Sequence, residues 1–138
     1  LVWNIEQGLT LTPRDIARAE TARTTLWQRV RAFMETHELL ILPTVAVQPF
    51  PVEQPYPTEI NGRPLDNYTQ WFFLTYGITV TGLPVISVPC GFTKSGLPVG
   101  LQIVGRRRQE AMVLRAAAAF EAAAPWADRI PPAVPART

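Results

Sequence analysis

Several residue types that carry out much of protein chemistry are scarce in this chain. Among its 138 residues, cysteine, lysine and histidine each occur once and serine occurs twice. A single cysteine excludes a disulfide within the chain and a metal site built from several cysteines. Scarce cysteine also fits a reducing compartment. We therefore expect a cytoplasmic protein that uses no metal and no cofactor.

Net charge and long hydrophobic runs are limited as well. The formal net charge is +2, and 47% of the residues are hydrophobic and 17% charged, a composition typical of one soluble domain. No apolar run reaches the ~20 residues that a membrane-spanning helix needs. The one basic run, 106–108, has no aromatic or further basic residues beside it, which favours a solvated turn over a phosphate-binding patch. We predict neither a nucleic-acid partner nor a membrane partner.

The most informative stretch runs from Gly82 to Gly105. Two apolar runs rich in β-branched residues are separated by the turn-forming sequence 93–96. Two strands joined by a turn of that length form a β-hairpin, which we place at residues 85–105. Pro84, Pro89 and Pro98 cannot donate to a strand ladder, so we expect them at strand ends or bulges.

Helical patterns predict three helices, over residues 12–36, 65–80 and 109–124. Thr12, Pro13 and Asp15 form a typical helix start. The second predicted helix is apolar on more than one side, which indicates burial or a pocket wall. The expected buried stripe of the first helix consists of Ala19, Ala22, Leu26, Val30 and Phe33, and that of the last helix of Val113, Ala117, Phe120 and Ala124.

Between these helices the sequence predicts a strand at 39–45 and a proline-rich loop at 46–64. The prolines make regular structure improbable in the loop, although Asn61-Gly62 is a strong turn signal. We interpret the loop as a surface segment wrapping the protein body, with a partner-binding segment as the alternative. The proline-containing tail at 125–138 is expected to be ordered only if it docks.

The residues of the hairpin carry a resemblance to a known family. The sequence GLPVISVPCG at 82–91, followed by SGLPVGLQIVG at 95–105, resembles the C-terminal half of the amidase signature family. Residues 39–44, which end in Pro-Thr, and the alanine-rich segment 109–124 follow that family's order on either side. The resemblance covers roughly residues 9–124. It implies hydrolysis or transfer of carboxamide groups.

The catalytic groups of that family have no counterpart in this sequence. The family uses a lysine, a serine in a cis peptide and a nucleophilic serine, the two serines lying in a Gly/Ser-rich segment of its N-terminal half. Here Lys94 and Ser95 are neighbours in a turn, and Ser87 lies within a strand. Adjacent turn residues do not provide the geometry of a base and its nucleophile. We therefore assign no catalytic residue and predict that this segment alone is inactive.

The resemblance instead implies one wall of a substrate pocket. The helix before the Gly-Leu-Pro element lines the pocket in the family, and its positions here correspond to Phe72, Thr75 and Tyr76. The glutamine-dependent tRNA amidotransferase branch has an acidic residue near position 72, so the aromatic residue here favours an amidase acting on less polar amides. Structural support of the site is expected from Gly82, Pro84 and Gln102, with Gln102 a buried, hydrogen-bonded amide.

Two further reactive side chains are given structural roles. Cys90 is expected to be a buried, inert thiol. His37, the only histidine, lies near the end of the first helix, which favours a capping or surface role over that of a catalytic base.

The fold class we expect is α/β: the C-terminal part of the amidase-signature mixed β-sheet sandwiched by helices, with a β-hairpin and flanking helices. The first residue is leucine and the chain begins within a pattern, so we expect a segment of an amidase whose N-terminal part carries a Ser/cis-Ser/Lys acyl-enzyme mechanism. Its partners would be a small-molecule amide substrate and that N-terminal part. Unpaired strand edges and apolar patches predict self-association. The alternative is a non-catalytic interaction module that retains the half-fold.

Overall fold

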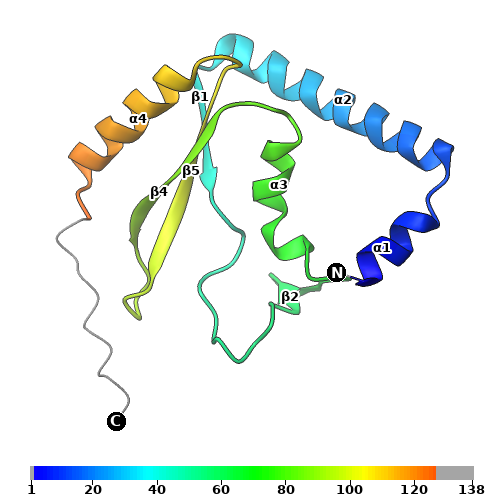
Figure 1. The fold of residues 1–138 in the computed structure, drawn as a ribbon. Helices are drawn as coiled ribbons and strands as arrows, with labels where there is room; N and C mark the ends of the chain where they lie inside the picture. Colours follow the sequence, from blue (N-terminus) through cyan, green and yellow to red (C-terminus); the bar gives the residue numbers. More distant parts are fainter. Residues whose placement is uncertain (1, 127–138) are drawn as a thin grey trace.

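The computed structural model describes residues 2–126 and shows an α/β arrangement with one principal sheet (Figure 1). Helices lie on both sides of this sheet, and a long N-terminal helix extends away from it. The fold class predicted from the sequence is confirmed. The elements are α1 (Val2–Leu9), α2 (Pro13–Thr36), β1 (Leu39–Pro43), β2 (Glu59–Ile60), β3 (Arg63–Pro64), η1 (Gln70–Phe72), α3 (Phe73–Thr79), β4 (Val85–Phe92), β5 (Pro98–Gly105) and α4 (Glu110–Ala123).

The predicted hairpin forms the larger part of the principal sheet. Its strand order is β1-β5-β4, and both pairings are antiparallel. The ladder between β4 and β5 shifts register between Pro89 and Gly91, so Cys90 is the extra residue of a β-bulge. Proline lacks a backbone N–H, which explains why the irregularity begins at Pro89. Within the described residues, β1 and β4 each keep one unpaired edge.

The central strand β5 is covered on both faces at its C-terminal end. The four consecutive residues 102–105 are all buried, and successive strand residues point to opposite faces. On one face a Cβ at Gly105 would lie 2.4 Å from Val113 Cγ2 of α4. On the other face the Gln102 side chain reaches the carbonyl oxygen of Leu74 in α3. The sheet is therefore sandwiched between α4 and α3.

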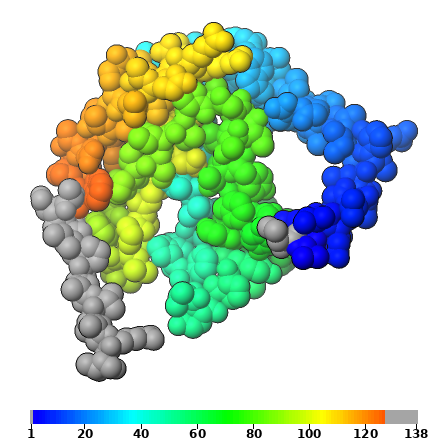
Figure 2. Space-filling model, in the orientation of Figure 1, coloured from blue at the N-terminus to red at the C-terminus, as the bar shows by residue number. Residues whose placement is uncertain are grey.

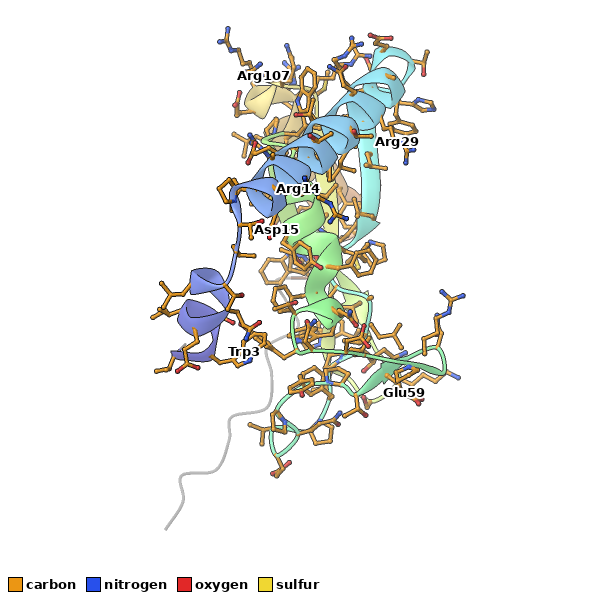
Figure 3. All side chains as sticks on the ribbon, turned by 90° about the vertical axis from the view of Figure 1, so that its right-hand side faces the viewer. Trp3, Arg14, Asp15, Arg29, Glu59 and Arg107 are labelled. Atoms are coloured by element: carbon orange, nitrogen blue, oxygen red, sulfur yellow. The ribbon has the colours of Figure 1, made fainter. Side chains whose placement is uncertain are left out.

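A capping box starts α2. The Thr12 hydroxyl accepts from the backbone N–H of Asp15, and the Asp15 carboxylate accepts from the Thr12 backbone N–H at 2.9 Å. Figure 3 shows Asp15 at this end of the helix. The hydrogen bond from the Thr12 hydroxyl and then that from its N–H hold the pKa of Asp15 below its ordinary value. This stabilisation is present above the unfolded pKa of 3.8 and is lost as the pH falls through the lower folded value.

The stripe predicted for the buried face of α2 is only partly covered. The body covers Met34 and partly covers Trp27 and Val30, whereas Leu26 and Phe33 remain 36% and 38% exposed. Ala19 and Ala22 are also exposed. Figure 2 shows open space between α3 and the first half of α2. The helix itself forms as predicted, but its apolar arc is wider than the surface that this chain supplies to cover it.

The helix expected at 65–80 is shorter than predicted. Helical structure begins only at Gln70, as η1, and continues as α3 to Thr79. Before it, the Asn67 side-chain carbonyl oxygen accepts from the backbone N–H and the hydroxyl of Thr69. Asp66 exchanges hydrogen bonds with the Gln70 side chain. Such local side-chain bonds compete with helix formation, so they hold a turn where the apolar pattern predicts a helix.

The proline-rich segment contains regular structure that its prolines argue against. The two-residue strands β2 and β3 pair across a turn in which Asn61 has φ 51° and Gly62 φ 74°. Positive φ at both turn residues is the geometry that Asn-Gly favours. The remainder of the segment has no strand or helix, and Figure 3 shows Glu59 marking the hairpin at the end of the molecule far from Arg107.

Most of the tail that was predicted beyond the last helix lies outside the described residues. The α4 helix ends at Ala123 and Pro125 follows shortly after it. The predicted tail at 125–138 is described only to Trp126. Over residues 2–126, no helix combines the length and the apolar character required to cross a membrane.

Candidate functional site

An apolar hollow lies where the end of β1 meets the bulged half of the hairpin. It is a groove of about 660 Å³, a volume in the range typical of small-molecule sites. None of the side chains that line it is charged. Its lining consists of residues 43–50, Trp71, Cys90 and residues 98–101.

An aromatic cluster forms the wall that joins this groove to α3. Trp71 meets Phe50 edge-on, with ring centroids 5.6 Å apart and planes at 89°. Trp71 also contacts Phe72 at 5.3 Å, and Phe72 contacts Tyr76 at 5.8 Å. Tyr68 adds a further ring against Phe72. Edge-to-face pairs of this kind stabilise by about 0.5–1.5 kcal/mol beyond area burial, so the wall is a packed unit.

Thr44 links the groove to strands β4 and β5 and to helix α3. Its backbone N–H donates to the Gly100 carbonyl at 3.0 Å, and its hydroxyl lies 2.7 Å from the Ser87 hydroxyl. Its carbonyl oxygen accepts from the Thr75 hydroxyl at 3.0 Å and from Gln102 Nε2 at 3.2 Å. Segments from four elements therefore meet at one residue at the end of β1.

The three residues predicted to line the substrate pocket do not share one environment. Phe72 is half-buried within the aromatic cluster, and neither Phe72 nor Thr75 is among the residues that line the groove. Thr75 is engaged with the Thr44 carbonyl. Tyr76 is 41% exposed and lines a second hollow beside the β2–β3 hairpin.

The three residues predicted to support the site occupy the sheet and its approach. Gln102 is 3% exposed, and its Nε2 donates to the carbonyl oxygens of Pro43, Thr44 and Leu74. Gly82 has φ 68°, a left-handed conformation that favours glycine, and it follows the end of α3. The Pro84 carbonyl accepts from the Gly105 N–H at 2.9 Å and so links the hairpin entrance to the end of β5.

The expectation for Cys90 is wrong. Its side chain is exposed and lines the groove, with Sγ 3.6 Å from the Val99 carbonyl oxygen. The bulge is the physical reason, because one extra residue in a strand changes which face the side chain points to. The sequence signal is present in Pro89 and Gly91, which flank Cys90 and are both poor ladder residues.

The polar residues weighed as catalytic candidates are separated in space. Ser95 pairs with the Thr93 hydroxyl at 2.8 Å in the β4–β5 turn that also holds Lys94. Ser87 lies five residues before the end of β4, roughly 17 Å along the strand at ~3.3 Å per residue. His37 caps α2 with its ring stacked on Phe33 at 4.0 Å. Over residues 2–126, no group of three or more His, Cys, Asp or Glu side chains is placed to hold a metal ion.

Sequence reasoning missed the proline-rich segment as a wall of the groove. Residues 45–50 line it, and Phe50 supplies one of its two aromatic rings. The only sequence signal is the length of the irregular segment, since long loops in compact domains are often functional. Trp71 falls within the apolar helix predicted at 65–80, but its place in the groove depends on η1 rather than on α-helical spacing.

Comparison with known proteins gives a consistent set of similarities. The Amidase family model matches residues 2–114. An acylamidase from Rhodococcus erythropolis is 43% identical over 132 residues, which make up 95% of this chain and 28% of that protein. A glutamyl-tRNA(Gln) amidotransferase subunit from a Cyanothece species is 35% identical over 114 residues, or 83% of this chain and 22% of that protein. The crystal structure of a bacterial aryl acylamidase, an amidase signature enzyme, matches with a TM-score of 0.82 at 32% identity, over 90% of this chain and 26% of that one.

These matches involve the same class of protein and cover a similar share of each one. The chain spans about a quarter of the length of the proteins it matches. The family model covers the N-terminal helices, the sheet and the start of α4 in one continuous match. The resemblance inferred from the Gly-Leu-Pro elements is confirmed, and the chain belongs to the amidase signature family.

Proposed function

We propose that this chain is the C-terminal portion of an enzyme that hydrolyses carboxamide C–N bonds. Its relatives are amidases and an amidotransferase subunit, which supports an amide-processing parent. In this proposal the parent forms an acyl-enzyme through a lysine, a serine in a cis peptide and a nucleophilic serine, all upstream of this segment. The segment contributes fold and part of the substrate pocket.

The observation that carries the proposal is the groove lined without a charged side chain. An ionised substrate group entering it would lose hydration without gaining a counter-charge, which is costly. A linear amide of low polarity has no such cost. The aromatic Phe72 supports the same choice, because a phenyl ring does not pair with an ammonium as a carboxylate does. We therefore favour an amidase over an amidotransferase that binds free glutamine.

In this proposal, the residues of this chain contact the substrate and position α3 and the hairpin. The aromatic cluster around Phe72 offers apolar surface to the substrate. Gln102, buried between β1, β5 and α3, fixes the carbonyl oxygens of Pro43, Thr44 and Leu74 and so holds α3 against the sheet. Gly82 and Pro84 set the path from α3 into the hairpin. Attack on the carbonyl carbon and stabilisation of the oxyanion belong to the N-terminal part of the enzyme.

Because the proposal places all catalytic residues upstream of this segment, it predicts that the 138-residue chain alone does not hydrolyse amides. We expect no release of p-nitroaniline from p-nitroacetanilide above buffer, whereas the complete protein carrying this segment hydrolyses the anilide. A fluorophosphonate probe should label one serine of the complete protein, and mass spectrometry should place it outside this chain. Labelling of Ser87 or Ser95, or turnover by the chain alone, would contradict the proposal. Absence of both labelling and turnover in the complete protein would favour the non-catalytic module.

The incompletely covered apolar arc of α2 predicts that the isolated chain self-associates. Leu26 and Phe33 lie on the open apolar arc and are 36% and 38% exposed, and exposed apolar surface drives association. We expect the mass measured by light scattering to rise with concentration. The double substitution Leu26→Glu and Phe33→Glu should shift the chain toward monomer. The matched control Arg29→Glu, on an exposed position of the same helix, should not; equal masses for both variants would count against this prediction.

A further inference from the structure

Two hydroxyl groups meet at the edge of the groove, and their hydrogen bonding is incomplete. Thr44 Oγ1 and Ser87 Oγ lie 2.7 Å apart although the residues are 43 positions apart in sequence, and either oxygen can donate. Each hydroxyl carries one proton, so a single bond between them uses one of the two. Within residues 2–126, the other proton has no protein acceptor. The pair therefore keeps one O–H donor for a ligand or for solvent.

A glycine makes room for the hydroxyl pair. A Cβ at Gly100 would lie 2.7 Å from Thr44 Oγ1 and 3.3 Å from Ser87 Oγ. Both hydroxyls thus occupy the space above β5 that any other side chain at position 100 would fill. The backbone N–H of Thr44 donates to the Gly100 carbonyl at 3.0 Å, which holds the two segments at this separation.

The pair is fixed in place before any ligand arrives. The Thr44 carbonyl oxygen accepts from Thr75 and from Gln102, while Ser87 lies in the paired strand β4 opposite Gln102. A donor held by the surrounding structure loses little freedom when it binds, so its hydrogen bond contributes more to affinity.

The residues around the hydroxyl pair disfavour a charged ligand. Thr44 and Gly100 both line the groove, and its lining contains no Asp, Glu, Lys, Arg or His. A carboxylate or ammonium would have to give up hydration there without an ion-pair partner. A neutral carbonyl oxygen needs one donor, which the hydroxyl pair has. A flat apolar body fits beside the edge-to-face rings of Phe50 and Trp71.

We propose that the Thr44–Ser87 hydroxyl pair, seated over Gly100, anchors the carbonyl oxygen of a small uncharged aryl ligand whose ring lies in the adjoining groove. The inference rests on the proposed function for its ligand class, because a neutral carboxamide is such a ligand. The pair holds a carbonyl oxygen of the bound ligand and has no part in stabilising the oxyanion. The hydroxyl pair and the groove beside it belong to this chain, so binding there can be tested without turnover.

Cys90 provides the readout, because it is the only thiol, is exposed and lines the same groove. The rate at which N-ethylmaleimide alkylates Cys90 is followed by intact-protein mass spectrometry, with benzamide as the neutral aryl carbonyl probe. We expect benzamide to slow alkylation several-fold. Benzoate and benzylammonium, which keep the ring and carry a charge, should leave the rate unchanged. Equal protection by all three compounds, or none by benzamide, would overturn the proposal.

Substitutions at the pair separate the anchor from the apolar groove. Thr44→Val keeps the shape of the side chain and removes the hydroxyl, so the protection by benzamide should be lost while the unprotected alkylation rate is kept. Thr44→Ser restores a hydroxyl and should restore protection. If circular dichroism shows that Thr44→Val does not fold, the exposed Ser87→Ala decides the question in the same assay. Full protection in a folded variant that lacks a hydroxyl of the pair would refute the anchor.

The enzyme proposal and the hydroxyl-pair proposal can be refuted independently of each other. If the complete protein does not hydrolyse anilides but benzamide still protects Cys90 through Thr44, the anchor stands and the enzyme proposal falls. If hydrolysis is found and protection is absent, the substrate carbonyl binds elsewhere and the anchor falls.

Discussion

Replacing Gln102 with leucine should lower the free energy of unfolding by about 1–3 kcal/mol. The side chain is 3% exposed, and its Nε2 donates to three carbonyl oxygens, those of Pro43, Thr44 and Leu74. Leucine has a similar size but no donor, so these partly buried acceptors lose the partner that the folded chain supplies. Thr44 keeps the bond from Thr75, whereas the links from β5 to Pro43 and Leu74 are removed.

Urea unfolding followed by circular dichroism measures this loss. The protein should be dilute enough for the midpoint to be independent of concentration, because association would add its own stabilisation. Gln48→Leu is the matched control, since Gln48 is exposed and should change stability by no more than about 0.5 kcal/mol. Equal midpoints for Gln102→Leu and the wild-type chain would show that the amide does not hold the sheet to α3.

Gly105→Ala should destabilise the chain by about 1–3 kcal/mol through overpacking. The new methyl group would lie 2.4 Å from Val113 Cγ2, and the Gln109 carbonyl oxygen would be 3.6 Å away. Val113 is buried and faces the sheet from α4, so the helix must shift outward to accept the methyl group. Gly105 has no positive φ, which leaves steric contact as the cause.

A double-mutant cycle tests this cause directly. Val113→Ala alone destabilises by leaving a cavity. Combined with Gly105→Ala, it gives the new methyl group the space that the valine leaves, so the double variant should lose less stability than the two single variants together. Gly77→Ala in α3 is the control, because nothing lies within 4 Å of its Cβ and alanine favours helix. Additive losses in the cycle would show that the contact between β5 and α4 is not what Gly105 protects.

The parts of the fold that could be predicted are those decided by neighbouring residues. The hairpin follows from two apolar runs and the turn between them, and the start of α2 follows from Thr12 and Asp15, three residues apart. The prediction failed at 65–69, where Asn67 bonds to Thr69 two residues away. There a local polar bond outweighed an apolar pattern of longer range.

The candidate site could be predicted only in part, because its residues come from distant segments. Phe72 follows from the family pattern and belongs to the aromatic cluster, yet it does not line the groove. Phe50 and Cys90 do line it. Phe50 carries no local signal, and the Pro89 and Gly91 that flank Cys90 indicate a bulge but not a groove. The single extra residue in β4 turned Cys90 from an expected core position to an exposed one.

The sequence by itself determined the family, the hairpin and the α/β class, since these depend on motif residues and on periods of two or 3.6 residues. Tertiary structure decided which faces are covered: α4 and α3 enclose β5, while half of the apolar arc of α2 stays open. It also brought Thr44, Ser87 and Gly100 together, three residues from three segments. Their proximity depends on strand order and register, which hydrophobic patterning within one segment does not specify.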